Sequence, residues 1–374
     1  MPLSTFLFVF GTRPEAIKMA PLIKALKKEG HYSVKVCVTG QHRQLLDQVL
    51  SFFEITPDYD LDLMKPNQSL FDLTADMLRN LEDIFDKCKP DLVFVQGDTT
   101  TAFIGALASF YKKIKVAHIE AGLRSQNKTS PFPEEMNRIL VGDLAEYHFA
   151  PTQTAKSNLL REGITEDKVF VVGNTVIDAL FLGLEFITRH GDRVYHDFFN
   201  FLDFSKQIIL VTGHRRESFG EGFEMICLAL KKVAERYKDL QIVYPVHLNP
   251  HVMEPVHRIL GKIKNIFLID PLGYQHLLWL MKKSYIVLTD SGGIQEEAPS
   301  LGIPVLVMRE VTERIEGIEA GTAKLVGVTT DGIVNSVVEL MQNEDLYNKM
   351  AQSVNPYGDG TASTNIVRTL KGQS

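Results

Sequence analysis

The sequence has few cysteines, no excess of basic residues and no long apolar run. Its 374 residues include only three cysteines, Cys37, Cys88 and Cys227, and none of them forms a CxxC pair. An odd number of widely spaced cysteines is typical of a reduced compartment and argues against disulfide bonds or a structural zinc site. The histidines form no HExxH pattern, so we expect no metal and no cofactor.

The charge balance and the apolar runs exclude two further kinds of partner. The chain has 40 Lys and Arg against 46 Asp and Glu, a net charge of −6, which gives no basic excess for binding nucleic acid. No stretch approaches the roughly 18–20 apolar residues that a membrane-spanning helix requires. The apolar N-terminus is short and has no basic lead-in, so we interpret it as a strand and not as a signal peptide. We therefore expect a cytoplasmic protein.

Short apolar runs alternate with longer helical patterns along the chain. Such alternation predicts parallel βαβ units, and a chain of this length favours two domains. In the first half we expect strands at residues 6–10, 33–39, 91–96, 115–120, 147–150 and 169–173. The same alternation of apolar runs and helical segments begins again later, with expected strands at residues 207–213, 240–246, 265–270, 285–290, 304–309 and 324–328.

The segment between the two series of strands is helical and rich in aromatic residues. We place a domain boundary there, with an N-terminal Rossmann-like domain at residues 1–173 and a C-terminal Rossmann-like domain at residues 174–356. A final helix, at about residues 357–374, is expected to pack back onto the first domain. The predicted fold class is α/β, with two doubly wound domains facing a central cleft. Ligands of such sheets bind at the carboxyl ends of the strands.

The segment GTRPEAIK follows the first expected strand. Thr12 and Glu15 have the spacing of a capping box at a helix start. Arg13 and Lys18 would add charge-assisted hydrogen bonds to an anion at this helix N-terminus, although they could also be a solvated surface pair. Pro21 is expected to interrupt the regular helix. Because GxGxxG and Walker patterns are absent, neither dinucleotide binding nor nucleotide hydrolysis is indicated.

A second turn of small residues follows the expected strand at 285–290. The backbone N–H groups of Ser291, Gly292 and Gly293 can converge on phosphate oxygens, and a helix from about Ile294 would add its positive end. An outward carboxylate early in that helix, such as Glu297, could accept two ribose hydroxyls. The alternative is a glycine turn before a capped helix.

Three acidic loops follow strands of the first domain. Asp98 comes after the strand at 91–96, where its alternative role is to cap the next helix. His118 and Glu120 end the strand at 115–120. Glu134 and Glu135 stand at a proline-framed helix start, where they could merely complement the helix dipole. Together the loops place carboxylates at neighbouring strand ends, and carboxylates suit proton transfer.

The second domain carries its own cations at strand ends. His214 and Arg215 lie in the segment VTGHRRESFG, where a histidine beside two arginines favours contact with an anion. His247 and Arg314 follow other strands. The sequence therefore predicts an anionic ligand with a polyphosphate, held between the two domains.

Several of these segments match the motifs of one known family. FGTRPEAIKMAPL, GDTTTA, HIEAGLRS, PFPEEMNR, GNTVIDAL, VTGHRRESFG and TDSGGIQEEAPSLG resemble the bacterial non-hydrolysing UDP-N-acetylglucosamine 2-epimerases, in that family's order from about residue 7 to residue 360. The resemblance implies a glycosyltransferase-B fold, a homodimer and interconversion of UDP-GlcNAc with UDP-ManNAc. In that reaction UDP leaves C1 as a base removes the C2 proton, and UDP then adds back to the 2-acetamidoglucal.

The resemblance also implies a role for individual residues. The acid and base set would be Asp98, Glu120 and Glu134, and Lys18 and His214 would contact the departing diphosphate. Further UDP contacts would be Arg13, Ser291, Gly292, Gly293, Glu297 and Arg314, with Leu272 and Leu277 standing where relatives have residues near the uracil. Some relatives bind a second substrate molecule, and Gln41, Gln44, Arg215 and His247 resemble part of that site.

Four other functions remain compatible with the sequence. A hydrolysing relative would release ManNAc and UDP, and an epimerase of a UDP-diacetamido uronic acid would use a different sugar. A sugar transferase of the same fold would need an acceptor. A UDP-sugar-binding regulator would have no turnover, and the acidic loops argue against it.

Overall fold

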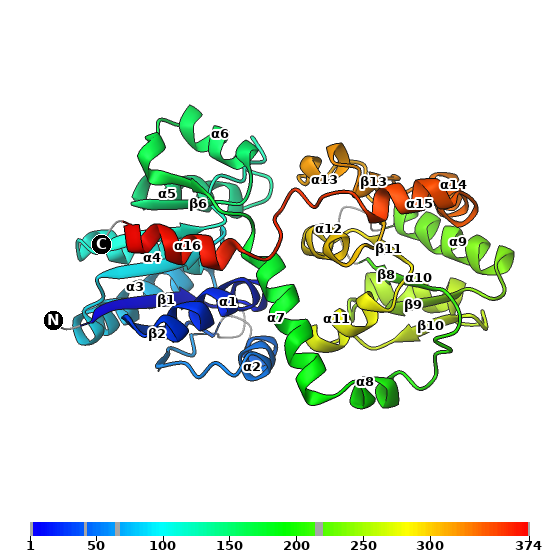
Figure 1. The fold of residues 1–374 in the computed structure, drawn as a ribbon, viewed down its shortest axis with the longest axis horizontal. Coiled ribbons are helices and arrows are strands. Elements are labelled where there is room, and N and C mark those ends of the chain that lie inside the picture. Colours follow the sequence, from blue (N-terminus) through cyan, green and yellow to red (C-terminus); the bar gives the residue numbers. More distant parts are fainter. Residues whose placement is uncertain (1–2, 41–42, 64–67, 214–219, 373–374) are drawn as a thin grey trace. The chain divides into compact units, whose positions relative to one another are not determined.

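The computed structural model describes residues 3–40, 43–63, 68–213 and 220–372, without the side chains of residues 43, 44 and 190. The chain forms two compact units (Figure 1). Unit 1 contains the residues up to Leu182 and those from Tyr357 onward, and unit 2 contains Gly183–Pro356. The division falls inside helix α7 (Thr175–His190), further along the chain than the sequence pattern suggests, because one continuous helix leads out of unit 1.

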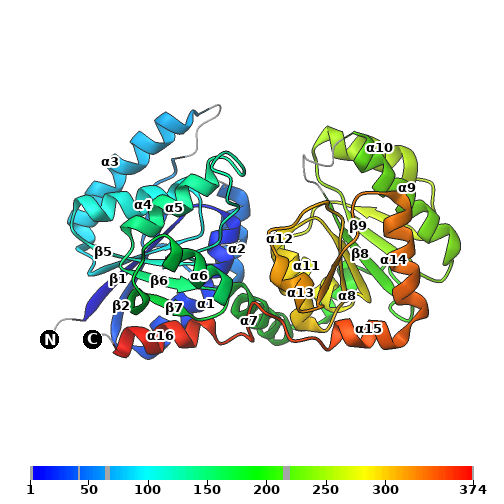
Figure 2. The same cartoon turned by 90° about the horizontal axis from the view of Figure 1, so that it is seen from above.

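Unit 1 is built on a seven-stranded sheet in the order β3-β2-β1-β4-β5-β6-β7, with all neighbouring strands parallel. Helices α3 and α4 lie on one face, and α1 and α16 lie on the other (Figure 2). The elements are β1 (Ser4–Phe10), α1 (Arg13–Glu29), β2 (Tyr32–Val38), α2 (Arg43–Phe52), β3 (Tyr59–Asp60), α3 (Leu70–Cys88), β4 (Leu92–Gln96), α4 (Thr100–Tyr111), β5 (Lys115–Ile119), α5 (Glu134–Leu144), β6 (Tyr147–Ala150), α6 (Gln153–Arg161), β7 (Val169–Val171), α7, and α16 (Ala362–Gly372).

The central strand β1 is buried on both faces, as its continuous apolar sequence predicts. Leu7 and Val9 belong to the core that β1 shares with α3 and α4. On the alternate positions, the ring of Phe8 stacks on that of Phe94 at a centroid distance of 4.5 Å. Helices on both faces therefore fix β1, and the residues that follow it, at the centre of the sheet.

Helix α1 begins with the capping box that the sequence predicts. The Thr12 side chain accepts a hydrogen bond from the Glu15 amide, and the Glu15 carboxylate accepts one from the Thr12 amide. The expectation that Pro21 interrupts the helix is wrong, since α1 continues to Glu29. Pro21 removes one backbone donor, but the buried side chains of Ile17 and Leu22 hold this stretch against the sheet.

Unit 2 is built on a six-stranded parallel sheet in the order β10-β9-β8-β11-β12-β13. Its main core includes apolar side chains of β8 and β9 with helices α9, α10 and α14. The elements are α8 (Arg193–Phe198), β8 (Ile208–Thr212), α9 (Glu221–Arg236), β9 (Gln241–Pro245), α10 (Pro250–Leu260), β10 (Ile266–Ile269), α11 (Tyr274–Lys282), β11 (Ile286–Thr289), α12 (Gly292–Glu297), β12 (Val305–Val307), α13 (Ile315–Glu319), β13 (Ala323–Leu325), α14 (Thr330–Gln342) and α15 (Glu344–Ala351).

The strand order reverses once in each sheet, between β1 and β4 in unit 1 and between β8 and β11 in unit 2. In open parallel sheets, a crevice for ligands forms outside the carboxyl ends of the strands at this reversal. Within the parts of the chain that the structure covers, no helix is long and apolar enough to cross a membrane.

The loop after β5 packs so closely on α6 that only glycine fits at position 122. Gly122 has a φ of +89°, and a Cβ there would lie 2.2 Å from the carbonyl oxygen of Ala155. We expect Gly122→Ala to lower the free energy of unfolding by about 2–4 kcal/mol, from the strained backbone and the overlap together. Chemical denaturation would measure the loss.

The matched control for this prediction is Gly163→Ala. Gly163 has a similar φ of +92°, but nothing lies within 4 Å of a Cβ built there. The control therefore carries only the backbone cost, about 1–2 kcal/mol. Equal losses in the two variants would show that the close approach to α6 is unimportant.

Candidate active site

In unit 1, one buried carboxylate ties together the two loops at the strand reversal. Glu15 accepts hydrogen bonds from the amides of Gly11 and Thr12 at 3.0 and 2.8 Å, just after β1. Its other oxygen accepts a bond of 2.6 Å from the hydroxyl of Thr99, just after β4. Burial raises the pKa of Glu15, against the opposing effect of these hydrogen bonds. Glu15 thus links the residues that follow β1 to those that follow the neighbouring strand β4.

Asp98 follows β4 and does not cap the next helix. Thr99 caps α4 instead, since its side chain accepts a hydrogen bond of 3.0 Å from the amide of Ala102. The alternative role of Asp98 as a helix cap is therefore wrong. The Asp98 carboxylate forms an ion pair with Arg138, and the side-chain amide of Asn137 donates to the Asp98 carbonyl at 2.9 Å.

Arg138 links Asp98 to a second, buried carboxylate on the same helix, α5. Its guanidinium donates to Glu135 at 2.9 Å, and the Glu135 side chain is 1% exposed. Glu135 also accepts bonds of 3.0 Å from the amides of Ser125 and Gln126. Burial acts to lower the pKa of Arg138, but the neighbouring carboxylates, Asp98 first, outweigh it and raise that pKa. The cation is thus permanent, and it fixes the position of Asp98.

Glu120 follows β5 and is held by residues from two other parts of unit 1. Its carboxylate forms an ion pair with Lys18 of α1 and accepts a hydrogen bond of 2.9 Å from the side-chain amide of Asn174. Two residues earlier, His118 lies with Nε2 2.7 Å from the carbonyl oxygen of Gly97. Burial lowers the pKa of His118 to about 3, so the ring is neutral and donates this hydrogen bond near neutral pH.

Glu134 differs from the other two candidate carboxylates. It is the first residue of α5 and is half-buried. Among the residues that the structure describes, none forms a hydrogen bond or an ion pair with its carboxylate. Asp98 and Glu120 are thus each held beside a cation, whereas the Glu134 side chain is held by neither kind of contact.

In unit 2, the reversal lies between the ends of β8 and β11. The hydroxyls of Thr212 and Thr289 lie 2.6 Å apart there. The amide of Ser291 donates to the Thr289 hydroxyl at 2.9 Å, so this N–H does not point at a ligand, contrary to expectation. Helix α12 begins at Gly292, earlier than the expected start near Ile294. The amides of Gly292 and Gly293 remain as candidate phosphate donors.

Arg314 lies directly against this glycine turn. A Cβ built on Gly292 would come within 3.2 Å of the Arg314 guanidinium carbon, so no larger residue fits at position 292 without a shift. The guanidinium donates from Nε to the buried carboxylate of Glu296 at 2.8 Å. A cation is therefore fixed beside a turn of small residues.

The expectation of an outward carboxylate early in α12 is wrong. Glu296 and Glu297 lie at the end of this short helix and are 1% and 6% exposed. Glu297 accepts a hydrogen bond of 2.9 Å from the hydroxyl of Tyr274. Its orientation is therefore set by α11, and its burial comes from the packing of α12 in unit 2.

The remaining candidate residues are scattered or undescribed. Arg13 is the half-buried first residue of α1, Leu272 is buried just before α11, and Leu277 lies half-buried within α11. His247 follows β9, where its Nδ1 accepts a hydrogen bond of 3.1 Å from the amide of Asn249. The predictions for Gln41, His214 and Arg215, and for the side chain of Gln44, lie outside the described residues.

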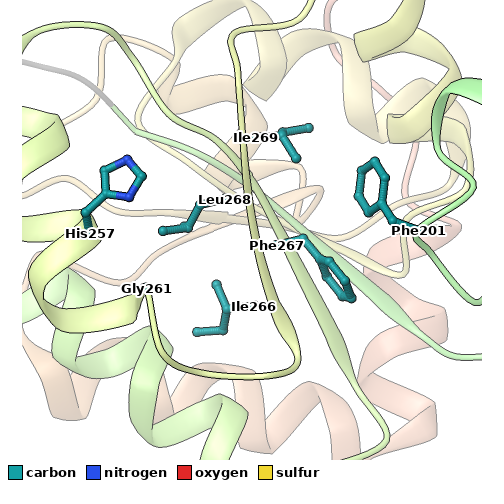
Figure 3. Close-up of a pocket in the computed structure, with 7 residues that line it drawn as sticks. All are labelled: Phe201, His257, Gly261, Ile266, Phe267, Leu268 and Ile269. Atoms are coloured by element: carbon teal, nitrogen blue, oxygen red, sulfur yellow. The ribbon is translucent and has the colours of Figure 1, made fainter.

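A groove of about 460 Å³ in unit 2 contains none of the candidate residues (Figure 3). Its lining comes from the edge strand β10, the end of α10 and one preceding loop: Ile266, Phe267, Leu268, Ile269, His257, Gly261 and Phe201. Its lining side chains are apolar except for His257, and none of the described candidate cations lines it. Among the described residues, no three His, Cys, Asp or Glu side chains gather as a metal ion would require.

Buried His148 in β6 makes stability dependent on pH. Burial, followed by the charge of Lys168, lowers its pKa to about 4 from an ordinary value of 6.5. The unfolded chain therefore binds a proton more readily, and stability falls as the pH drops from about 6.5 to 4. A depression of this size corresponds to about 3 kcal/mol.

Between pH 7 and pH 4, we expect the unfolding free energy of the parent to fall by about 3 kcal/mol more than that of His148→Gln, as measured by urea titrations. The control, His257→Gln, changes an exposed histidine on α10 and should follow the parent curve. Identical pH dependence in His148→Gln and the parent would contradict the prediction.

Sequence reasoning missed most of the contacts that hold the candidate side chains in place. Glu135 and Arg138 do have the i, i+3 spacing of a helical ion pair, which was the one local indication available. Asn174, Tyr274 and Glu296 carry no such indication. Their partners lie far along the chain and come together only through the tertiary fold.

Two doubly wound units, each with charged side chains gathered where its strand order reverses, define an α/β protein with a glycosyltransferase-B-like fold. The sequence profile of the UDP-N-acetylglucosamine 2-epimerase family matches residues 24–371. The chain belongs to that family.

Individual relatives match over almost the full chain. The UDP-N-acetylglucosamine 2-epimerase of Escherichia coli K12 is 55% identical over 368 residues, 98% of each chain. The one from Campylobacter jejuni is 53% identical and covers 97% of this chain and 96% of its own. A crystal structure of UDP-GlcNAc 2-epimerase from Neisseria meningitidis bound to UDP-GlcNAc is 52% identical, with a TM-score of 0.92 over 98% of this chain and 100% of that one.

Proposed function

We propose that this protein interconverts UDP-GlcNAc and UDP-ManNAc by inverting C2 of the sugar. The observation that carries the proposal is the set of carboxylates at neighbouring strand ends of unit 1, with Asp98 and Glu120 each fixed beside a cation. Binding an anion would not favour such a set, whereas moving a proton requires it. Family membership and the UDP-GlcNAc bound to the Neisseria relative support the choice of substrate.

The proposed reaction has two halves. A carboxylate removes the C2 proton while UDP leaves C1, which gives 2-acetamidoglucal and UDP. UDP then adds back to C1 while a proton is delivered to the opposite face of C2. Inversion needs a proton-transfer group on each face, and we assign these steps to Asp98, Glu120 and Glu134. Lys18 and His214 would offset the charge on the departing diphosphate.

We assign the binding of the nucleotide chiefly to unit 2. The position of the Arg314 guanidinium against Gly292 supports this, because it fixes a positive charge beside a turn whose amides are candidate phosphate donors. Glu297, oriented by Tyr274, would accept the ribose hydroxyls. The other proposed contacts are Arg13, Leu272, Leu277 and Gly293, and Ser291 through its side chain alone, because its N–H donates to Thr289.

The product distinguishes this proposal from its rivals. Purified protein is incubated with UDP-GlcNAc in ordinary water and followed by proton and phosphorus NMR. UDP-ManNAc with little free UDP is expected. Accumulating ManNAc and UDP would indicate the hydrolysing reaction, and UDP release only with an added acceptor would indicate a transferase. Unchanged UDP-GlcNAc would overturn the proposal, and turnover of a UDP-diacetamido uronic acid in a parallel tube would identify the replacement substrate.

Arg314→Lys is expected to weaken UDP binding about 10-fold or more, as measured by calorimetry. Lysine keeps the charge but loses the planar fork, which is worth about 1.5–3 kcal/mol in a charge-assisted contact. The control is Arg258→Lys, which changes an exposed ion pair with Glu254 on α10. Unchanged affinity in Arg314→Lys would remove Arg314 from the proposed nucleotide site.

The non-hydrolysing course, a cytoplasmic location and a homodimer are further parts of the proposal. The odd, widely spaced cysteines support a reducing compartment. Light scattering on the purified protein would test the dimer, and a monomeric mass at micromolar concentration would contradict it.

A further inference from the structure

Glu120 is the one candidate carboxylate whose own backbone is strained. Its φ is +65°, in the left-handed region that residues with a side chain seldom adopt. Such a conformation persists only where surrounding contacts hold it. Its side chain is 8% exposed, and Lys18 and Asn174 both donate to the same oxygen, Oε2.

Asn174 is 2% exposed and has its amide orientation fixed from both sides. Its Oδ1 accepts a hydrogen bond of 3.1 Å from the amide of Val176, in the first turn of α7. The oxygen therefore faces the helix, and Nδ2 must face Glu120, to which it donates at 2.9 Å. A flipped amide would break both bonds.

The returning C-terminal segment holds Asn174 in this place. The backbone N–H of Asn174 donates a hydrogen bond to the carbonyl oxygen of Tyr357 at 2.7 Å. One turn further along α7, the Asp178 carboxylate accepts bonds from the amides of Ala362 and Ser363 at 3.2 and 2.7 Å. These two amides stand at the start of α16, whose far end forms an ion pair with α1. Both flanks of Asn174 are thus anchored within unit 1.

We infer that Asn174 is a positioning residue for Glu120 and that the segment at Tyr357 holds it there. The inference rests on the proposed function, in which Glu120 exchanges the C2 proton. A neutral donor on Oε2 orients the carboxylate and stabilises its ionised form without adding charge. Among the described residues, the charged and titratable groups that act on Glu120 are Lys18 from α1, Arg138 from α5 and His118 from β5. Asn174 differs from all of them because its side-chain amide does not titrate.

Three variants of the full chain test this role. Asn174→Ala removes the donor, and Asn174→Asp places a carboxylate against Oε2 while it keeps an acceptor for the Val176 amide. The matched control is Asn365→Ala on α16, whose side chain donates to the Val172 carbonyl at 3.4 Å and so touches the same segment without reaching Glu120. Each variant is assayed for exchange at C2 in D2O, UDP affinity and thermal stability.

We expect Asn174→Ala to slow C2 exchange about 10- to 100-fold per folded molecule with unchanged UDP affinity, and Asn365→Ala to exchange at the parent rate. The dependence of the C2 exchange rate on pH is also measured. In Asn174→Asp, the pH below which this rate declines should rise by about one unit. Equal rates in Asn174→Ala and Asn365→Ala, or no rise of that pH in Asn174→Asp, would overturn the inference.

A second measurement separates this inference from the proposed function. Carbon-13 NMR of glutamate carboxyls in the ligand-free protein follows the titration of Glu120, whose signal is assigned by its absence in Glu120→Gln. The midpoint should shift upward in Asn174→Asp and stay in place in Asn365→Ala. If the parent converts no UDP-GlcNAc yet this shift occurs, only the proposed function fails. If the parent is active and the midpoint does not move, only the inference fails.

Discussion

Glu120→Gln is expected to slow the exchange of the C2 proton by about 100- to 10,000-fold, the usual contribution of a general acid or base. A glutamine has no proton affinity near neutral pH and cannot serve either face of C2. UDP affinity should change little, because the nucleotide contacts are assigned mainly to unit 2. The measurement is the rate of deuterium incorporation at C2 in D2O, beside UDP calorimetry.

Loss of the ion pair with Lys18 also threatens the fold, so stability must be separated from chemistry. The control Glu146→Gln breaks an ion pair with Lys168 in the same unit, where both side chains are about 40% exposed, and should exchange at the parent rate. Glu134→Gln tests a carboxylate that lacks such an ion pair among the described residues. Because no described residue pairs with the Glu134 carboxylate, this variant should lose exchange without losing stability. Parent-like exchange in either Glu120→Gln or Glu134→Gln would remove that residue from the acid and base set.

Arg138→Met is expected to lower the free energy of unfolding by about 3–5 kcal/mol. Removing one partner of a buried ion pair leaves the other charge uncompensated, and Glu135 is almost fully buried beside Arg138. Asp98 loses its guanidinium at the same time, so exchange per folded molecule should also fall. Denaturation curves and the C2 exchange assay measure the two losses.

The control for Arg138 is Arg189→Met, which breaks an exposed i, i+4 pair with Glu185 and should cost about 0.5 kcal/mol or less. The loss of unfolding free energy in Arg138→Lys should lie between those of Arg138→Met and Arg189→Met. Lysine keeps the charge but cannot bridge two carboxylates equally well. A loss below 1 kcal/mol in Arg138→Met would show that Glu135 and Asp98 do not depend on this cation.

The architecture of each sheet follows from local pattern. Each of the twelve predicted strands overlaps a strand of the structure, because buried parallel strands are apolar runs between helical segments. The strand that escaped prediction, β3, has only two residues, Tyr59 and Asp60, and so has no periodicity to detect. The capping box at Thr12 was also predictable, since it depends on residues three apart.

Two errors arose where tertiary contacts override a local preference, and one where a neighbouring residue took the expected role. Pro21 was expected to break α1, but burial of that helix face keeps it continuous. Asp98 was a reasonable cap by residue type, yet Thr99 stands one position closer to the helix and takes that role. Glu297 was expected to point outward, but α12 packs into unit 2 on that side.

The positions of the candidate carboxylates were predictable, whereas their partners were not. Parallel strands end at a common edge, so Asp98 and Glu120 could be placed there from sequence alone. The pairing of Glu120 with Lys18 spans 102 positions and that of Asp98 with Arg138 spans 40. Such pairings depend on strand order and helix placement, which no short window of sequence contains.

The exchange of one hydrogen at C2 tests the central claim most directly. The parent protein is incubated with UDP-GlcNAc in D2O, and the sugar is followed by proton NMR. The account predicts UDP-ManNAc that carries deuterium at C2, followed by deuterium in the recovered UDP-GlcNAc. UDP-ManNAc that retains the original hydrogen at C2 would contradict it, because the carboxylates would then have taken no proton from that carbon.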